Sequence, residues 1–295
     1  MSWYRSEQAT ATEPVAPPDW YPDPSGVGEL RYWDGAAWTP GVVVGGRVVE
    51  RPLPPPGQAP VTQAGPRAPL PPRAALLALV GVVVGLALSI GQSLLGLAAG
   101  LPRTVRLVVS QAGLWTGLVG ACWLASRRFG RGSIVGDFGL RVRGADVGWG
   151  LLAALAARFA VGMAVLPFML SGSKRLLGAN DRVFRVVKDD PAGFVVVAVL
   201  AVIGAPVVEE LFFRGLLQGS LLSSLGVAQA IVVQAVLFGL AHVNPILGLA
   251  NVTVVVAITA AGIVFGVTAG RRGLPSSMVA HGAFNAVAVA VAATL

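Results

Sequence analysis

Residues 192–218 read AGFVVVAVLAVIGAPVVEELFFRGLLQ, and this stretch decides the fold class. It is apolar over a length that suits a helix crossing a hydrocarbon core of about 30 Å, which takes about 20 residues. Backbone groups inside lipid must bond within their own segment, so the stretch is expected to be helical. A β-barrel is disfavoured because barrel strands alternate apolar and polar residues over about 10 positions.

Six further apolar segments lie between Arg73 and the last residue of the chain. The seven expected spans are 74–100, 104–126, 147–171, 192–218, 226–242, 250–270 and 274–295. Of the 295 residues, 55% are apolar and 12% are charged, whereas about a quarter of an ordinary soluble domain is charged. The sequence therefore predicts an all-α polytopic membrane protein with a bundle of about seven transmembrane helices.

The net charge of +8 does not indicate nucleic-acid binding, because the basic residues do not form one face. They lie in short clusters between apolar segments, such as Arg127–Arg128 and Arg271–Arg272, which is typical of loops that flank membrane spans. The expected partner is therefore the lipid bilayer, with anionic headgroups, and no nucleic acid. The distribution of arginines favours a multi-pass cell-membrane protein with a cytoplasmic N-terminus.

Residues 1–45 form a unit that holds four of the seven tryptophans and all three tyrosines. Turn signals such as Asp34-Gly35 separate short aromatic runs, which predicts one or two tight β-hairpins; a partly disordered aromatic tail is the alternative. The unit resembles a small tryptophan-rich module found at the N-terminus of many bacterial membrane proteins. Residues 46–72 are rich in proline and predict an extended linker, which leaves 73–295 as the membrane domain.

Between Pro191 and Gly270, the only Asp, Glu, Lys or Arg residues are Glu209, Glu210 and Arg214. A charge inside a span is costly and persists mainly where it is paired, hydrated or functional. Glu210 and Arg214 are four residues apart and are placed for an ion pair on one helical face. Glu209 points about 100° away, so it is not neutralised in the same way. The alternative is that all three residues are structural, holding helices together without a catalytic role.

The chain has only two histidines, His242 and His281, and both lie in apolar segments. A single histidine in such a segment is more often a packing residue, but here no histidine lies in a loop. Asn285 follows His281 by four residues, so the two side chains share a helical face. A carboxylate, two imidazoles and a carboxamide are the groups needed to activate water and stabilise an oxyanion.

Three motifs now resemble the signature of a known family, the CAAX prenyl endopeptidase and bacteriocin-processing (CPBP, Abi-like) intramembrane proteases. They are Glu209-Glu210-x-x-x-Arg214 (209–214), Phe238-x-x-x-His242 (238–242) and His281-x-x-x-Asn285 (281–285). The stretch DFGLRVRGADVGWG also resembles one that commonly precedes the family core. The resemblance covers roughly residues 75–295 and implies an intramembrane endopeptidase.

The resemblance also implies roles for individual residues. The catalytic residues would be Glu209, His242, His281 and Asn285, supported by the ion pair of Glu210 and Arg214. In that scheme the first glutamate and the first histidine activate the attacking water, whereas the second histidine and the asparagine hold the oxyanion. The implied substrate is a membrane-associated peptide or protein, either CAAX-like or a peptide precursor.

Helix length raises a difficulty for this site, because full-length spans would place His242 near the outer face and His281 towards the inner face. Segment 226–242 covers only about 25 Å, less than the hydrocarbon core. We therefore expect its helix to end partway, with Asn244 and Pro245 as irregular backbone that lines a wet cavity. Arg158 lies in mid-segment outside every motif, and either snorkels or neutralises a carboxylate.

Other functional classes remain open. A non-catalytic scaffold or bacteriocin-immunity-type protein would keep the fold but would not need a side chain that acts as a base. A proton-coupled transporter would be expected to contain inverted repeats, and none is visible in the sequence. No cofactor is favoured. Zinc held by Glu209, His242 and His281 is the alternative, but a carboxamide such as Asn285 is a poor zinc ligand and no His-Glu-x-x-His helix is present.

Overall fold

The computed structural model describes residues 18–53, 70–130, 132–173, 190–244 and 247–294. The chain divides into two compact units, residues 1–69 and residues 70–295, and each is described by itself.

The first unit contains a four-stranded antiparallel sheet with strand order β1-β2-β3-β4. Its strands are β1 (Asp19–Pro22), β2 (Leu30–Trp33), β3 (Trp38–Val44) and β4 (Arg47–Glu50). The predicted β-rich module is confirmed, but β4 lies past residue 45, where the sequence indicated linker. The reason is a two-residue turn: Gly45 and Gly46 have φ angles of 58° and 77°, which suit the tight hairpins that right-twisted strands favour.

The sheet is held together by aromatic rings and one buried ion pair. Tyr21 and Trp33 are buried, and the Trp38 ring lies 5.4 Å from that of Trp33, centroid to centroid. Arg31 Nε donates to Asp23 Oδ1 at 2.8 Å with both side chains buried. Burial alone would raise the pKa of Asp23, but hydrogen bonds, chiefly from Arg31, outweigh it and lower that pKa to about 2. Such contacts compensate for the small apolar core of so short a unit.

The second unit is helical. Its elements are α1 (Ala74–Ala98), α2 (Arg103–Phe129), α3 (Ile134–Phe138), α4 (Gly144–Leu170), α6 (Pro191–Val199), η1 (Leu200–Gly204), α7 (Ala205–Glu209), η2 (Glu210–Gln218), α8 (Gly219–Leu221), α9 (Val227–Leu240), α10 (Ala250–Arg272) and α11 (Leu274–Ala293). In the described part of the chain, six helical stretches are long and apolar enough to cross a membrane, with α6 to α8 continuous as Pro191–Leu221. The predicted membrane bundle is confirmed. The fifth expected span, 226–242, corresponds to α9, which has only 14 residues.

The helices pack through small residues and expose large apolar ones, the arrangement expected in lipid. On α1, Ala78, Gly81 and Gly85 are buried, whereas Leu79 and Val83 are exposed. A Cβ added to Gly81 would lie 2.5 Å from the Cβ of Ala121 on α2. Only glycine lets these two backbones approach so closely.

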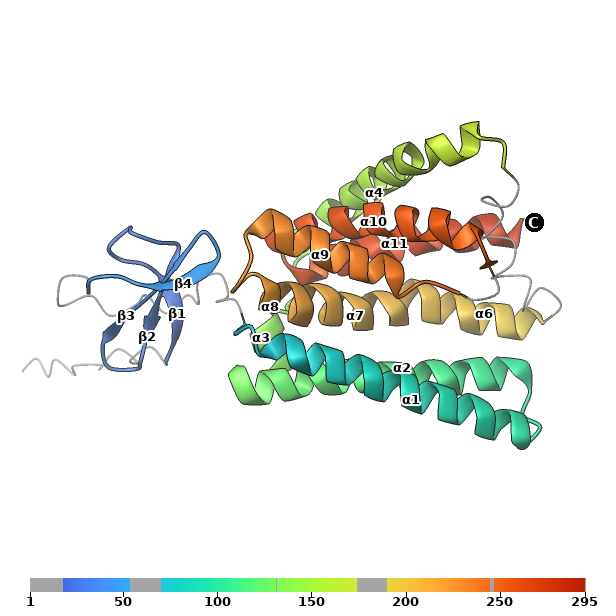
Figure 1. Cartoon of the computed structure of the whole chain (residues 1–295), viewed down its shortest axis with the longest axis horizontal. Helices are drawn as coiled ribbons and strands as arrows, with labels where there is room; N and C mark the ends of the chain where they lie inside the picture. The colour runs from blue at the N-terminus through green and yellow to red at the C-terminus, as the bar shows by residue number, and fades with distance from the viewer. Residues whose placement is uncertain (1–17, 54–69, 131, 174–189, 245–246, 295) are drawn as a thin grey trace, which may run out of the picture. The chain divides into compact units, whose positions relative to one another are not determined.

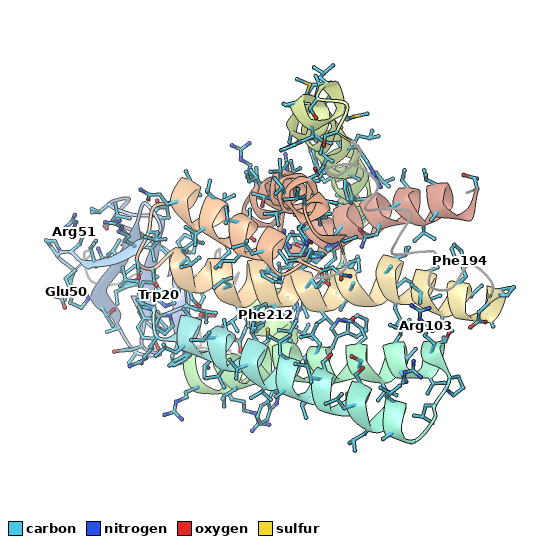
Figure 2. All side chains as sticks on the ribbon, turned by 45° about the vertical axis from the view of Figure 1, so that its right-hand side comes forward. Trp20, Glu50, Arg51, Arg103, Phe194 and Phe212 are labelled. Carbon is cyan, nitrogen blue, oxygen red and sulfur yellow. The ribbon has the colours of Figure 1, made fainter. Side chains whose placement is uncertain are left out.

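The continuous span α6–α8 lies between the α1–α2 pair and the remaining helices (Figure 1). α10 and α11 pack against each other and against α4, and α9 packs against α10. Phe212, on η2, is buried and lies between the central span and the α1–α2 pair (Figure 2). The segment that carries the two glutamates and Arg214 is therefore enclosed by helices on both sides.

Candidate active site at a π-helical segment

The backbone around the glutamates is not a regular α-helix. Two π-helical segments, η1 and η2, flank α7, which ends at Glu209. Pro206 has no N–H to donate to the carbonyl of Val202, which weakens regular α-helical bonding at this point. Gly282 of α11 lies against that carbonyl, since an added Cβ would be 2.8 Å from Val202 O. π-Helical turns are frequent at functional sites, and here one brings α11 close to the glutamates.

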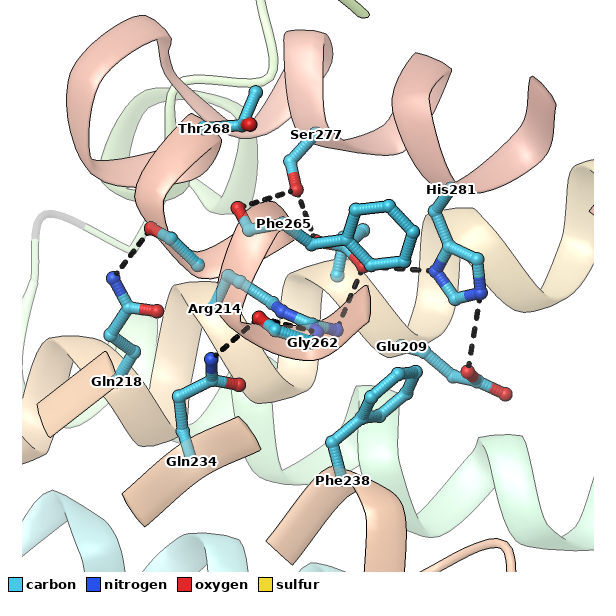
Figure 3. Close-up of polar contacts among 12 residues, drawn as sticks. Glu209, Arg214, Gln218, Gln234, Phe238, Gly262, Phe265, Thr268, Ser277 and His281 are labelled. Atoms are coloured by element: carbon cyan, nitrogen blue, oxygen red, sulfur yellow. Dashed lines mark hydrogen bonds and ion pairs between the residues drawn. The ribbon is translucent and has the colours of Figure 1, made fainter. Parts of the chain in front are cut away.

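Glu210 is fully buried and accepts three hydrogen bonds. Arg214 Nη1 donates to Oε1 at 2.8 Å, so the predicted ion pair is present. Ser277 Oγ donates to Oε2 at 2.6 Å, and Nδ1 of His281 lies 2.9 Å from Oε1 (Figure 3). Glu210 thus joins the central span to α11 and sets the orientation of the His281 ring, a contact that the sequence did not indicate.

The guanidinium of Arg214 contacts groups of three kinds, although among the described residues its buried Nε has no hydrogen-bond partner. Beyond the carboxylate of Glu210, Nη2 donates to the carbonyl of Gly262 at 3.3 Å. The guanidinium carbon lies 4.2 Å from the ring centroid of Phe238 and 5.5 Å from that of Phe265. Aromatic faces attract a cation strongly when it is desolvated. Phe238, the first residue of its motif, therefore packs against the arginine of the preceding motif.

Glu209 faces both histidines. Its Oε2 lies 4.0 Å from Nε2 of His242. The same oxygen lies 3.9 Å from Nε2 of His281 (Figure 3). Among the described residues, this buried oxygen has no hydrogen-bond partner. The His242 side chain is 33% exposed and that of Glu209 is 17% exposed, so the group opens to its surroundings beside His242. Separations near 4 Å are too long for hydrogen bonds but suit a bridging water molecule.

His242 reaches this position because α9 is short. The helix ends at Leu240, and Nδ1 of His242 lies 2.8 Å from the carbonyl oxygen of Phe238. A carbonyl only accepts, so Nδ1 carries the proton and Nε2 faces Glu209 with its lone pair when the ring is neutral.

The irregular backbone after α9 is satisfied by α10. The Asn244 amide donates to Asn251 Oδ1 at 2.9 Å, and Asn251 Nδ2 donates to the Asn244 carbonyl at 2.8 Å. The expected early end of the helix is therefore present, and such pairing is what lipid requires of non-helical backbone. Pro245 lies outside the described residues, and the wet cavity stays a prediction.

Asn285 lies one turn beyond His281 on α11, as predicted from the spacing. Its Nδ2 donates to the carbonyl of Ala201 in η1 at 2.8 Å. The amide therefore ties α11 to the π-helical segment. Its expected role as an oxyanion donor stays a prediction.

Arg158 takes neither of the two expected roles. It donates to the backbone carbonyl of Phe284, and its guanidinium carbon lies 3.9 Å from the Phe284 ring centroid. Among the described residues it has no carboxylate partner, and its Nε is buried without a hydrogen-bond partner. Arg158 therefore joins α4 to α11 immediately before Asn285.

Several polar residues of the core were missed by the sequence analysis. Gln218 and Gln234 donate to the carbonyls of Gly266 and Gly262 at 3.2 and 3.1 Å, and Ser276 Oγ donates to Asp146 at 2.7 Å. Their signal was available, since each glutamine is a polar residue within a mostly apolar segment. Buried polar groups need such partners, so these residues fix how the helices pack.

The alternative zinc ligands do not fit the ion well. Two atoms bound tetrahedrally to zinc at about 2.1 Å lie about 3.4 Å apart, whereas Glu209 Oε2 is 3.9 and 4.0 Å from the two imidazole nitrogens. Within the described ranges, no group of three His, Cys, Asp or Glu side chains is arranged to hold a metal ion.

Residues 191–287 match the model of a family described as type II CAAX prenyl endopeptidase, Rce1-like. Residues 18–62 match a family described as a protein of unknown function (DUF2510). Comparisons with curated proteins and with solved structures found no match. The expected family is confirmed, on a narrower range than 75–295, and the matched range contains all six predicted site residues.

Proposed function

We propose that the Rce1-like CAAX prenyl endopeptidase domain of this chain hydrolyses a peptide bond within or beside the membrane, using water activated by Glu209 and His242. The observation that carries the proposal is the convergence of Glu209 Oε2 on the two imidazole Nε2 atoms, at 4.0 and 3.9 Å. A water molecule between these groups would have three polar partners, which is enough to hold it in place.

The chemistry follows from the positions of the acceptors. Glu209 takes one proton from the water while the water oxygen attacks the scissile carbonyl. The other hydrogen stays on that oxygen and donates a hydrogen bond to the neutral Nε2 of His242, which orients the attack. The carbonyl π electrons move onto the oxygen and form an oxyanion. Glu209 then delivers its proton to the leaving amine as the carbon–nitrogen bond breaks. Glutamate is thus first base and then acid.

In this scheme, His281 stabilises the oxyanion. Its Nδ1 is engaged by Glu210 at 2.9 Å, so donation from Nε2 as well requires the protonated ring. The carboxylates of Glu210 and Glu209 lie beside this ring and compensate its charge. One amide hydrogen of Asn285 is used by Ala201, and the other is the second oxyanion donor in this scheme.

The proposed substrate is a membrane-associated peptide or protein, with a CAAX-like C-terminal tail as the first class to test because the family description names it. A peptide precursor is the second class. A non-catalytic scaffold is the competing function. It has no need for an oxygen such as Glu209 Oε2, which is buried and, within the described ranges, has no hydrogen-bond partner.

The six candidate spans found among the described residues make the chain a multi-pass membrane protein. We propose that its N-terminus is cytoplasmic. Arg73 precedes α1, Arg127 and Arg128 end α2, and Arg271 and Arg272 end α10. These helix ends lie at one end of the bundle (Figure 1). At the opposite end, Arg103 lies near Phe194 (Figure 2), and Arg106 donates to the Leu101 carbonyl. The sequence between α4 and α6 adds Lys174, Arg175, Arg182, Arg185 and Lys188 to that side, which narrows the charge difference between the two ends. An excess of arginine marks the cytoplasmic side.

The deciding experiment compares wild type with Glu209→Gln in detergent, using a membrane-fraction peptide library and a prenylated CAAX peptide. The variant is expected to lose cleavage by orders of magnitude while its melting curve stays unchanged. Glu29 is an exposed acid in the connection between β1 and β2. Glu29→Gln is the matched control and is expected to cleave normally. Wild-type turnover by Glu209→Gln would falsify the general-base role.

A further inference from the structure

The polar face of the candidate site continues one helical turn beyond two of the motifs. On the central span, Gln218 follows Arg214 by four residues, and on α9, Gln234 precedes Phe238 by four. Side chains four residues apart lie on one side of a helix, so each glutamine extends the side that carries the motif residue. Both glutamines are buried. They therefore belong to the interior that surrounds the site.

Each of the two carboxamides is held in one orientation by the backbone of α10. Nε2 of Gln218 donates to the carbonyl of Gly266 at 3.2 Å, and Nε2 of Gln234 donates to the carbonyl of Gly262 at 3.1 Å (Figure 3). A backbone carbonyl only accepts, so the atom that faces it must be the nitrogen. The oxygen of each carboxamide therefore points away from that carbonyl.

Three buried polar atoms around these contacts are left over. Among the described residues, Nε of Arg214 and Oε1 of both Gln218 and Gln234 have no hydrogen-bond partner. Buried polar atoms in folded proteins are nearly always paired, either with protein groups or with ordered water. Three such atoms on neighbouring side chains therefore indicate a small polar ligand that they share.

The three side chains converge on one stretch of α10. Nη2 of Arg214 donates to the Gly262 carbonyl at 3.3 Å, so the guanidinium and the Gln234 carboxamide meet at one oxygen (Figure 3). A Cβ added to Gly266 would lie 2.6 Å from Nε2 of Gln234 and 2.9 Å from Oε1 of Gln218. Both carboxamides thus approach the same glycine, and any larger residue there would displace them.

One water molecule matches the three unpaired atoms. Nε of Arg214 is a donor, whereas Oε1 of Gln218 and Oε1 of Gln234 are acceptors. A water that accepts from the first and donates one hydrogen to each of the other two pairs all three, and buried waters typically make about three such bonds. A metal cation does not fit beside the positive guanidinium. An anion does not fit either, because it cannot donate to two carboxamide oxygens.

We propose that Arg214, Gln218 and Gln234 enclose a buried water molecule, and that this water holds Arg214 in the orientation in which it pairs with Glu210. The carboxylate of Glu210 in turn lies 2.9 Å from Nδ1 of His281. The two glutamines are therefore positioning residues that act on the His281 ring through Arg214 and Glu210. The water site rests on the geometry alone, whereas its effect on catalysis also rests on the proposed function.

The water itself is tested by a crystal structure of the full chain grown from a lipid phase, at a resolution that shows ordered waters. We expect density for one water within about 3.2 Å of Nε of Arg214 and of both Oε1 atoms. Lack of that density, or direct hydrogen bonds among the three side chains in its place, would overturn the proposal. This result does not depend on activity.

The effect on catalysis is tested with two matched glycine variants of α10. Gly266→Ala places a Cβ against both carboxamides, whereas Gly270→Ala, one turn further along, places it 3.9 Å from Nε2 of Gln218, an ordinary contact distance. Both variants gain the same helix propensity. We expect Gly266→Ala to lower kcat about tenfold with KM nearly unchanged, and Gly270→Ala to cleave like wild type. Gln234→Leu, which removes one Oε1, should reproduce the loss in kcat.

Coupling to His281 separates positioning from a general loss of stability. In the His281→Ala background, Gln234→Leu should lower kcat by less than about twofold, because the ring on which it acts is gone. A full tenfold loss in that background, or an unchanged kcat for Gln234→Leu alone, would overturn the positioning role. Failure of the proposed function is recognised separately, by wild-type turnover of Glu209→Gln, and leaves the density expected at the water site unchanged.

Discussion

Glu210 Oε1 lies 2.9 Å from Nδ1 of His281, a residue 71 positions further along the chain. The same carboxylate bonds Arg214 and Ser277. In the sequence, Glu210 is the expected partner of Arg214 alone. In the structure it also orients the imidazole of His281 in the candidate active site. Orienting contacts of this kind hold reactive side chains in their productive geometry.

Glu210→Gln should lower kcat by about tenfold or more while leaving KM nearly unchanged, because it frees the His281 ring without touching substrate. Steady-state kinetics on wild type, Glu210→Gln, His281→Ala and the double variant measure this. The double variant should be little worse than His281→Ala alone, since both act through one ring. If the losses of activity from the two single substitutions added fully in the double variant, Glu210 and His281 would act independently.

Arg214→Ala should lower the yield of folded protein, because it leaves the charge of Glu210 buried without its partner, at a cost of about 3–5 kcal/mol. Thermal melting in detergent measures the loss. Arg214→Met combined with Glu210→Gln should melt higher than Arg214→Ala, because the uncompensated charge is gone. Normal yield and an unchanged melting curve for Arg214→Ala would remove the ion pair from the account of stability.

Arg158→Met should lower the melting temperature, because it removes a charged hydrogen bond to Phe284 and a cation–π contact, together worth about 2–4 kcal/mol. Arg158→Lys keeps the charge and should recover part of the loss. Arg103→Met, at the end of the bundle, is the control. If Arg158→Met melts like wild type, α4 and α11 are held by packing alone.

Chelators should leave peptide cleavage unchanged, and purified active protein should contain zinc well below one ion per chain. The reason is geometric, since the Glu209–histidine separations of 3.9 and 4.0 Å are too wide for tetrahedral zinc. Elemental analysis with chelator titration and zinc add-back measures this. Stoichiometric zinc whose removal stops cleavage, and whose return restores it, would establish a metal mechanism instead.

Deleting residues 1–72 should leave a membrane domain that inserts and cleaves a small peptide at roughly the wild-type rate. α1 begins at Ala74 and every predicted site residue lies beyond position 200. Membrane-fraction yield and cleavage of one test peptide measure the outcome, with Glu209→Gln in the same truncated chain as the background. Loss of insertion would make the N-terminal unit part of the folding of the core.

The bundle could be predicted from sequence because lipid imposes a simple rule. A segment such as 74–98 must be helical and long enough to cross, whatever it packs against. Local spacing also predicts local contacts, so the Glu210–Arg214 pair could be anticipated from four residues of separation. The choice of Glu209 and the two histidines followed from the cost of polar groups in apolar spans.

The tertiary structure decided how those groups meet. The Asn285–Ala201, Arg158–Phe284 and Glu210–His281 contacts join different helices, and no helical period relates their positions. Beside the π-helical turns, Gly282 of α11 lies against the carbonyl of Val202, a contact between segments far apart in the chain. The sequence by itself therefore determined which polar side chains lie inside apolar spans, where burial in lipid is costly. Only the packing of α11 on the central span decided which of these side chains face one another.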